Sequence, residues 1–136
     1  KVKVLDGITF LNDSKGTNPD SSIKAIETMT GPTILIAGGM DKKSSFDSFV
    51  DAFGDKVKAL VLLGETADKI AQTAKEKGFT NIYYTKTIQE ATEKSFELSS
   101  PGYNVLLSPA CASWDMFKDY EERGKIFKEA VRSLRR

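Results

Sequence analysis

Short apolar runs alternate with amphipathic segments along most of this chain, and that alternation restricts its possible folds more than any other feature. Thr33–Ala37 is an apolar run typical of a strand covered on both faces, and Val57–Leu63 is predicted to be a second buried strand. Ile82–Tyr84 and Asn104–Leu107 are predicted as further strands. Because a helical pattern separates each strand from the next, we expect a parallel, doubly wound α/β sheet with right-handed crossovers.

The segments between these strands carry apolar side chains at helical spacing. Phe46, Phe49, Val50 and Phe53, for example, stand at positions i, i+3, i+4 and i+7. Four other helices are predicted. The first starts at Asn18-Pro19, the second runs from Ala67 to Gly78, and the third begins at the capping box Thr87–Glu90. The fourth is C-terminal and carries an apolar stripe of Ile126, Phe127, Ala130, Val131 and Leu134.

The first twelve residues follow a different pattern. Val2–Leu5 and Ile8–Leu11 flank Asp6-Gly7, which predicts an antiparallel hairpin at the edge of the sheet. The 136 residues are expected to form one domain. The chain lacks an initiator Met and starts inside this alternating pattern, so we expect it to be a piece of a longer protein.

Composition excludes several classes of function. The 20 Lys and Arg residues nearly balance the 19 Asp and Glu residues, which gives no electrostatic case for nucleic acid or an anionic membrane. No apolar run approaches the roughly 20 residues that a membrane-spanning helix needs. A single cysteine, Cys111, excludes an internal disulfide and fits a reducing, cytosolic compartment. The absence of histidine excludes Ser-His-Asp and Cys-His catalysis within this chain.

Three polar segments follow predicted strands, at the edge where doubly wound sheets bind ligands. The first, Asn12–Asn18, precedes a helix N-terminus, where Lys15 would favour an anion, although spacing alone somewhat favours a plain N-capped turn. It is not a Walker A motif. In the second, Gly38–Ser45, two glycines permit close approach of a ligand and Lys42 supplies positive charge; a solvated turn is the alternative.

The third segment, Ser108–Ser113, combines small residues with a serine that can offer its amide and hydroxyl to a ligand. Cys111 has no neighbouring histidine or lysine to form a thiolate, so it is interpreted as a small buried hydrophobe. Asp119–Arg123 is predicted to be a solvated, salt-bridged surface. The residues alone therefore predict an α/β domain suited to a small anion, without naming its substrate.

These three segments together resemble the C-terminal domain of the Mur ligase family. Asn12–Asn18 is similar to the family sequence Asn-Asp-Ser-Lys-Ala-Thr-Asn and departs from it at Gly16, while Gly38-Gly39 with Lys42 and Phe46 resembles the middle motif. Leu107–Ser113, followed by Asp115, Phe117 and Glu121–Gly124, resembles the last one. The likeness covers essentially the whole chain and implies a mostly parallel, Rossmann-like sheet with an N-terminal hairpin. The first loop is most similar to the members that add D-glutamate.

The resemblance implies a bacterial, cytoplasmic enzyme of peptidoglycan precursor synthesis. In this family ATP and Mg²⁺ activate the carboxylate of UDP-N-acetylmuramoyl-L-alanine as an acyl phosphate, and the amine of D-glutamate attacks it to give an amide, ADP and phosphate. An N-terminal domain holds the UDP sugar, a central domain carries the P-loop and metal ligands, and the C-terminal domain brings D-glutamate. The resemblance implies that this chain is the C-terminal domain, inactive alone, in a monomer that binds neither nucleic acid nor membrane.

The same resemblance implies roles for individual residues. Thr17 and Lys42 would hold one carboxylate of D-glutamate, while Ser113 and the backbone of Trp114 and near Tyr120 would hold the other. Asp13 would face the nucleotide ribose and Lys15 the phosphates. Trp114 and Tyr120 replace other residues of the family, a change that a backbone role tolerates. The competing hypotheses are a stand-alone nucleotide- or small-acid-binding module and, less favoured, an interaction domain.

Overall fold

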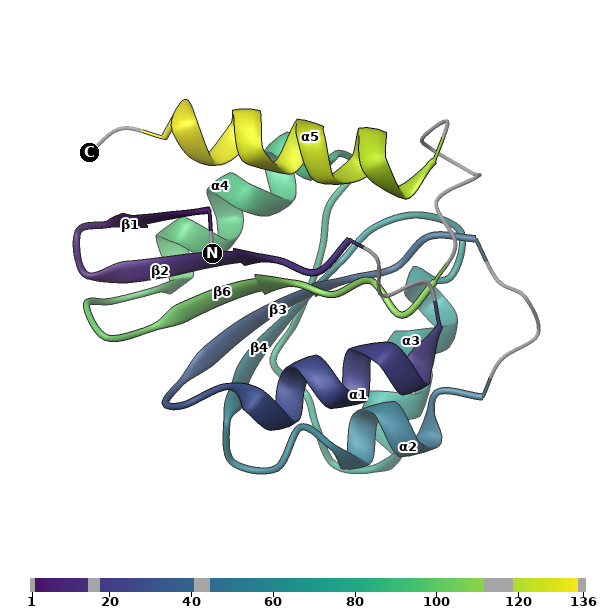
Figure 1. The fold of residues 1–136 in the computed structure, drawn as a ribbon. Coiled ribbons are helices and arrows are strands. Elements are labelled where there is room, and N and C mark those ends of the chain that lie inside the picture. Colours follow the sequence, from purple (N-terminus) through teal and green to yellow (C-terminus); the bar gives the residue numbers. More distant parts are fainter. Residues whose placement is uncertain (1, 15–17, 41–44, 112–118, 135–136) are drawn as a thin grey trace.

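The computed structural model describes residues 2–14, 18–40, 45–111 and 119–134, and these contain one six-stranded sheet. Strands and helices alternate from the second strand onward (Figure 1). In chain order the elements are β1 (Lys3–Leu5), β2 (Ile8–Asn12), α1 (Pro19–Thr28), β3 (Thr33–Ala37), α2 (Asp47–Asp51), β4 (Val57–Leu62), α3 (Ala67–Glu76), β5 (Ile82–Tyr84), α4 (Ile88–Leu98), β6 (Asn104–Leu107) and α5 (Tyr120–Arg132).

The strand order across the sheet is β1-β2-β6-β3-β4-β5. The hairpin strands β1 and β2 are antiparallel, whereas β2, β6, β3, β4 and β5 are parallel to their neighbours. In the register of the centre, Leu106 lies between Leu11 of β2 and Leu35 of β3. The mostly parallel sheet with an antiparallel N-terminal hairpin confirms the fold predicted from sequence.

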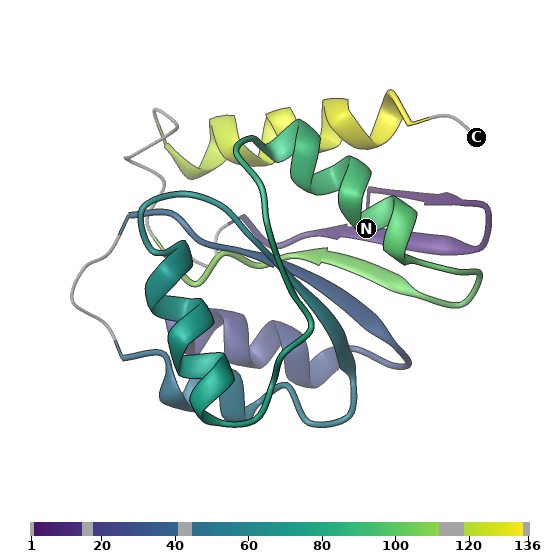
Figure 2. The same ribbon diagram turned by 180° about the vertical axis from the view of Figure 1, so that it is seen from behind.

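Helices cover both faces of the sheet, as a doubly wound fold requires. Helices α1, α2 and α3 lie on one face, and α4 and α5 lie on the other (Figures 1 and 2). Alternate residues of each central strand serve different cores: Leu35 packs with the first group of helices, and its neighbours Ile34 and Ile36 pack with the second. The sheet is therefore buried on both sides, which explains its continuously apolar strands.

Helix boundaries follow the predicted caps. The Asn18 side chain accepts a hydrogen bond from the Ser21 amide at 3.0 Å, and the Thr87 hydroxyl accepts one from the Glu90 amide at the same distance. Helix α2 is shorter than its four-residue apolar pattern indicates: Phe46 and Phe53, the first and last residues of the pattern, lie just outside its ends. All four residues of that pattern are nevertheless buried.

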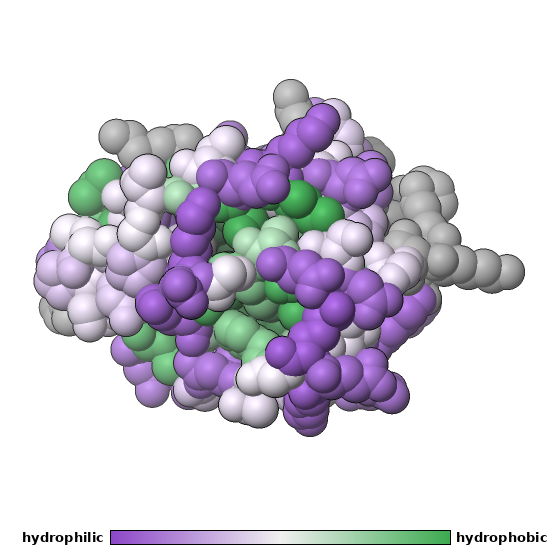
Figure 3. All heavy atoms as spheres, turned by 90° about the horizontal axis from the view of Figure 1, so that it is seen from below, coloured by the Kyte–Doolittle hydropathy of each residue, from purple (hydrophilic) through white to green (hydrophobic). Residues whose placement is uncertain are grey.

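The surface over α1 and α2 is mixed in character. Figure 3 shows hydrophilic side chains around this face, with apolar side chains visible between them. Ile23 and Met29 of this region are partly buried against the core. Within the described residues, no helix is both long and apolar enough to span a membrane.

Candidate functional site

The three polar segments start side by side at the carboxyl edge of the sheet. The Asp13 amide donates to the Leu107 carbonyl at 2.7 Å, which joins the end of β2 to the end of β6. The Gly38 amide donates to the Pro109 carbonyl at 3.0 Å, which joins the end of β3 to the segment after β6. The described flanks of all three segments therefore meet, as expected for adjacent parallel strands.

Two of the residues assigned by resemblance lie within the described part of the chain, Asp13 and Tyr120. The others lie outside it, so the D-glutamate and phosphate contacts assigned to them remain predictions; these residues are Lys15, Thr17, Lys42, Ser113 and Trp114. Both described residues line the same cavity, which brings the end of β2 and the start of α5 together.

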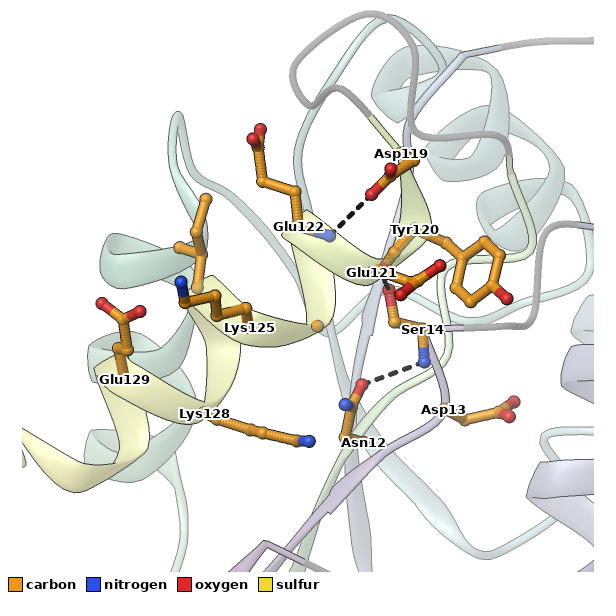
Figure 4. Close-up of a pocket in the computed structure, with 12 residues that line it drawn as sticks. Asn12, Asp13, Ser14, Asp119, Tyr120, Glu121, Glu122, Lys125, Lys128 and Glu129 are labelled. Carbon is orange, nitrogen blue, oxygen red and sulfur yellow. Dashed lines mark hydrogen bonds between the residues drawn. The ribbon is translucent and has the colours of Figure 1, made fainter.

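That cavity has a volume of about 970 Å³ and lies between the end of β2 and α5 (Figure 4). Two tight turns shape its walls. The Ser14 amide donates to the Asn12 side chain at 3.0 Å, and the Glu122 amide donates to the carboxylate of Asp119, the N-cap of α5, at 2.8 Å. The described lining residues are Asn12, Asp13, Ser14, Asp119, Tyr120, Glu121, Glu122, Gly124, Lys125, Ile126, Lys128 and Glu129.

The charge of this lining bears on its ligand. It includes two cations, Lys125 and Lys128, and a larger number of carboxylates, namely Asp13, Asp119, Glu121, Glu122 and Glu129. Such a lining favours hydroxyl and N–H donors over a dicarboxylate, because a like charge next to an anion is unfavourable. An anionic ligand at this edge would need further positive charge, and the role that the resemblance gives to Lys42 stays a prediction because Lys42 lies outside the described residues.

Asp13 is held in place at both its backbone and its side chain. Its amide is bonded to Leu107, and its Oδ2 accepts a hydrogen bond from the Ser108 hydroxyl at 2.7 Å. Figure 4 shows the carboxylate turned away from α5. The side chain is half-buried, and within the described chain no residue donates to its second oxygen, Oδ1. A fixed, partly exposed carboxylate of this kind suits the hydroxyl groups of a sugar.

Arg123 departs from the sequence interpretation. The segment Asp119–Arg123 was expected to form a solvated surface, but the Arg123 side chain is only 1% exposed. Its Nε and Nη2 donate to the hydroxyl and carbonyl of Ser14, at 3.0 and 2.7 Å, and its Nη1 donates to the Cys111 carbonyl at 3.0 Å. The prediction was wrong for Arg123, although Tyr120 and Glu121 are exposed as expected. Backbone and hydroxyl oxygens can satisfy a buried guanidinium, and a local charge pattern does not reveal them.

A second contact joins the same elements. The Ser14 hydroxyl donates to the Tyr120 carbonyl at 2.6 Å, so Ser14 bridges the loop after β2 to the first turn of α5. Gly124 makes this approach possible, since a Cβ there would lie 2.9 Å from Asn12 Nδ2 and 3.2 Å from Ser14 Cβ. Arg123, Ser14 and Gly124 together fix the wall of the cavity.

The start of the middle segment is held by Thr66, which follows β4. Its buried hydroxyl accepts from the Gly39 amide and donates to the Gly39 carbonyl, both at 3.1 Å. The Cys111 sulfur lies 3.3 Å from the same hydroxyl. Cys111 is 3% exposed, so its prediction as a small buried residue is confirmed.

Sequence reasoning missed these buried hydroxyls and Arg123. Ser22 of α1 is a further buried hydroxyl, and its spacing, four residues before the buried Ile26 on the same helix face, could have revealed it. No comparable signal marks Ser14, because the partners of its hydroxyl lie more than 100 positions away in the chain. No cluster of three or more metal-binding side chains (His, Cys, Asp or Glu) occurs in the described ranges.

The family model and the similar known sequences agree on one family. The family model described as "Mur ligase, glutamate ligase domain" matches residues 1–111. A protein of Thermoanaerobacter sp. (strain X514) is 56% identical over 99% of the chain, and one of Clostridioides difficile (strain 630) is 55% identical over 98%. Both are named UDP-N-acetylmuramoylalanine--D-glutamate ligase. The chain spans 30% of the length of each of these relatives.

Two solved structures share the fold at low sequence identity. UDP-N-acetylmuramate-alanine ligase MurC from Thermotoga maritima is 15% identical with a TM-score of 0.53, over 85% of this chain and 25% of that one. Mycobacterium tuberculosis folylpolyglutamate synthase, solved with ADP and AMPPCP, is 12% identical with a TM-score of 0.56, over 87% of this chain and 28% of that one. These two structures show the shared fold, and the match of the family model to residues 1–111 shows that the chain belongs to the Mur ligase family, as its glutamate ligase domain.

Proposed function

We propose that this chain is the C-terminal, D-glutamate-binding domain of an ATP-dependent ligase that adds D-glutamate to UDP-N-acetylmuramoyl-L-alanine. The observation that carries the proposal is the 56% identity, over 99% of the chain, to a ligase of that printed name. The relatives are about three times longer, which favours a part of a larger enzyme over a stand-alone binding module. The whole of residues 1–136 is assigned to this one domain.

The proposed contacts with D-glutamate follow the resemblance. Lys42 and Thr17 hold one carboxylate of the substrate, and Ser113 with the backbone at Trp114 and Tyr120 holds the other. Lys42 is given the leading role because a dicarboxylate substrate is held most strongly by charge-assisted hydrogen bonds from a cation.

ATP and Mg²⁺ are the cofactors implied by the family. The fit of this chain to a nucleotide rests on Asp13, whose fixed and partly exposed carboxylate suits ribose hydroxyls, with Lys15 assigned to the phosphate region. When bound, ATP supplies the phosphoryl group that activates the acceptor carboxylate. The P-loop and metal ligands are assigned to the central domain of the whole enzyme. We further propose a monomeric enzyme of the bacterial cytoplasm that binds neither nucleic acid nor membrane.

The direct test uses the whole protein that carries this domain. Incubation with ATP, Mg²⁺ and UDP-N-acetylmuramoyl-L-alanine should yield an amide product with D-glutamate, together with one ADP and one phosphate. Product formation with D-glutamate should exceed that with L-glutamate or D-alanine. If D-glutamate yields no amide, the proposed function is wrong.

Lys42→Ala tests the substrate role in the same assay. The variant should raise the D-glutamate KM by about tenfold to a hundredfold and leave the ATP KM nearly unchanged, because it loses one charge-assisted hydrogen bond. Lys43→Ala removes the adjacent lysine, for which no role is assigned, and serves as the matched control. An unchanged D-glutamate KM in Lys42→Ala would refute this role while leaving the ligase assignment intact.

A further inference from the structure

Beneath the carboxyl edge of the sheet, two buried serines line up behind the carboxylate of Asp13. The Ser108 hydroxyl lies 2.7 Å from Asp13 Oδ2 and 2.8 Å from the Ser22 hydroxyl. Both serine side chains are fully buried. They come from different elements, Ser22 from α1 and Ser108 from the residue directly after β6, so the alignment ties three parts of the fold together.

The direction of these hydrogen bonds follows from the number of protons available. A carboxylate can only accept, and the Ser108 hydroxyl has one proton, which goes to Asp13. The oxygen of Ser108 must then accept a hydrogen bond from the Ser22 hydroxyl, so Ser22, Ser108 and Asp13 form a row of hydrogen-bonded side chains. Both hydroxyl dipoles therefore point at the carboxylate, and each polarises the next.

This arrangement orients the carboxylate of Asp13 by holding one of its two oxygens from the protein interior. Oδ2 is occupied from the protein interior by Ser108, while Oδ1 receives no hydrogen bond from any residue in the described part of the chain. The Asp13 backbone is itself bonded to Leu107 at 2.7 Å. Rotation of the carboxylate would break the bond to a buried hydroxyl, which costs free energy because the hydroxyl has no water to replace it.

We propose that Ser22 and Ser108 are positioning residues that hold Asp13 in the orientation that accepts hydroxyl groups of the nucleotide sugar. The inference rests on the nucleotide-facing role given to Asp13 under the proposed function. It adds two residues that contact no ligand themselves and act through Asp13. Ser22 is the more informative one, because its hydroxyl reaches Asp13 only through Ser108.

The test measures ADP binding to the whole protein by titration calorimetry, beside steady-state kinetics. Ser108→Ala should weaken ADP binding about tenfold, and Ser22→Ala about threefold, because the first loses a bond to a charged group and the second a neutral one. The KM for D-glutamate should stay within about twofold of the parent value in both, since these hydroxyls act on Asp13, to which no contact with D-glutamate is assigned. The control is Ser95→Ala in α4, which removes an equally buried hydroxyl that donates to the Ala91 carbonyl at 2.7 Å.

A double-mutant cycle separates positioning from general damage. If the serines act through Asp13, Ser108→Ala should cause no further loss of ADP binding in an Asp13→Asn background, whereas independent effects would add. Additive losses, or ADP binding in Ser22→Ala and Ser108→Ala equal to that of Ser95→Ala, would overturn the inference. If Asp13→Asn alone leaves ADP binding unchanged, Asp13 does not bind the nucleotide and the inference is wrong. The amide-product assay then shows separately whether the protein is the proposed ligase.

Discussion

The guanidinium of Arg123 donates one hydrogen bond to the Ser14 hydroxyl and another to the Ser14 carbonyl, across 109 positions of sequence. A third, to the Cys111 carbonyl, makes this side chain the link between α5 and the segments that follow β2 and β6. Those segments carry the residues assigned to nucleotide and D-glutamate. The site is therefore built on a buried polar contact that depends on the packing of α5.

Arg123→Met should destabilise the domain by about 2–4 kcal/mol, because the buried carbonyls of Ser14 and Cys111 lose their partner. Urea unfolding followed by circular dichroism measures this, provided that the slope with denaturant stays the same. Lys128→Met, at an exposed position of the same helix, is the control and should change stability by less than about 0.5 kcal/mol. Equal stability of the two variants would show that the Arg123 contacts contribute nothing.

The backbone architecture was predictable from sequence because its signals are local. Thr33–Ala37 could hardly be anything but a doubly covered strand, and Asn18-Pro19 marks the start of α1 through its own cap. The Asp6-Gly7 turn sets the antiparallel hairpin by itself, since both residues adopt positive φ. In each case the residues that determine the structure are neighbours in the chain.

The polar interior of the site could not be predicted in this way. Arg123 stands in a run of charged residues that is typical of a surface, and only the approach of Ser14 and Cys111 in three dimensions buries it. The row formed by Ser22, Ser108 and Asp13 likewise depends on side chains from separate elements. Long-range contacts of this kind leave no periodic pattern in the sequence.

Gly38→Ala should be one of the most damaging small substitutions in the chain. Gly38 has a φ of 122°, and a Cβ there would overlap the Leu63 carbonyl oxygen, so the backbone at the end of β3 must move. We expect Gly38→Ala to lower the free energy of unfolding by about 3 kcal/mol or more. Gly54→Ala is the control, because Gly54 also has a positive φ, of 50°, but its added Cβ would meet nothing within 4 Å. Gly54→Ala should lower the free energy of unfolding by only about 1 kcal/mol. Thermal melting of both variants gives the comparison, and similar midpoints would contradict the overlap.

Lys77 joins α2 to the end of α3 and should titrate unusually late. A hydrogen bond to Asp51, with Nζ 3.0 Å from Oδ1, raises the pKa of Lys77 above its ordinary value of 10.5. A raised pKa stabilises the fold fully below the unfolded pKa, and this contribution is lost as the pH rises through the folded pKa. An NMR titration should show the Lys77 pKa falling in Asp51→Asn and unchanged in Asp55→Asn. No difference between the two would exclude Asp51 as the cause.

The isolated 136-residue chain should fold cooperatively but catalyse no ligation. Folding is expected because the described residues form a six-stranded sheet with helices packed on both faces. Inactivity is expected because the sequence contains no Walker A motif, and phosphoryl transfer depends on cations positioned around the phosphates. The expected result is a cooperative melt, with no ADP released when the chain is incubated with ATP, UDP-N-acetylmuramoyl-L-alanine and D-glutamate.

Addition of the separately produced N-terminal and central domains should restore activity if the division of labour is correct. Sustained ATP turnover by the chain alone would show that this division is wrong.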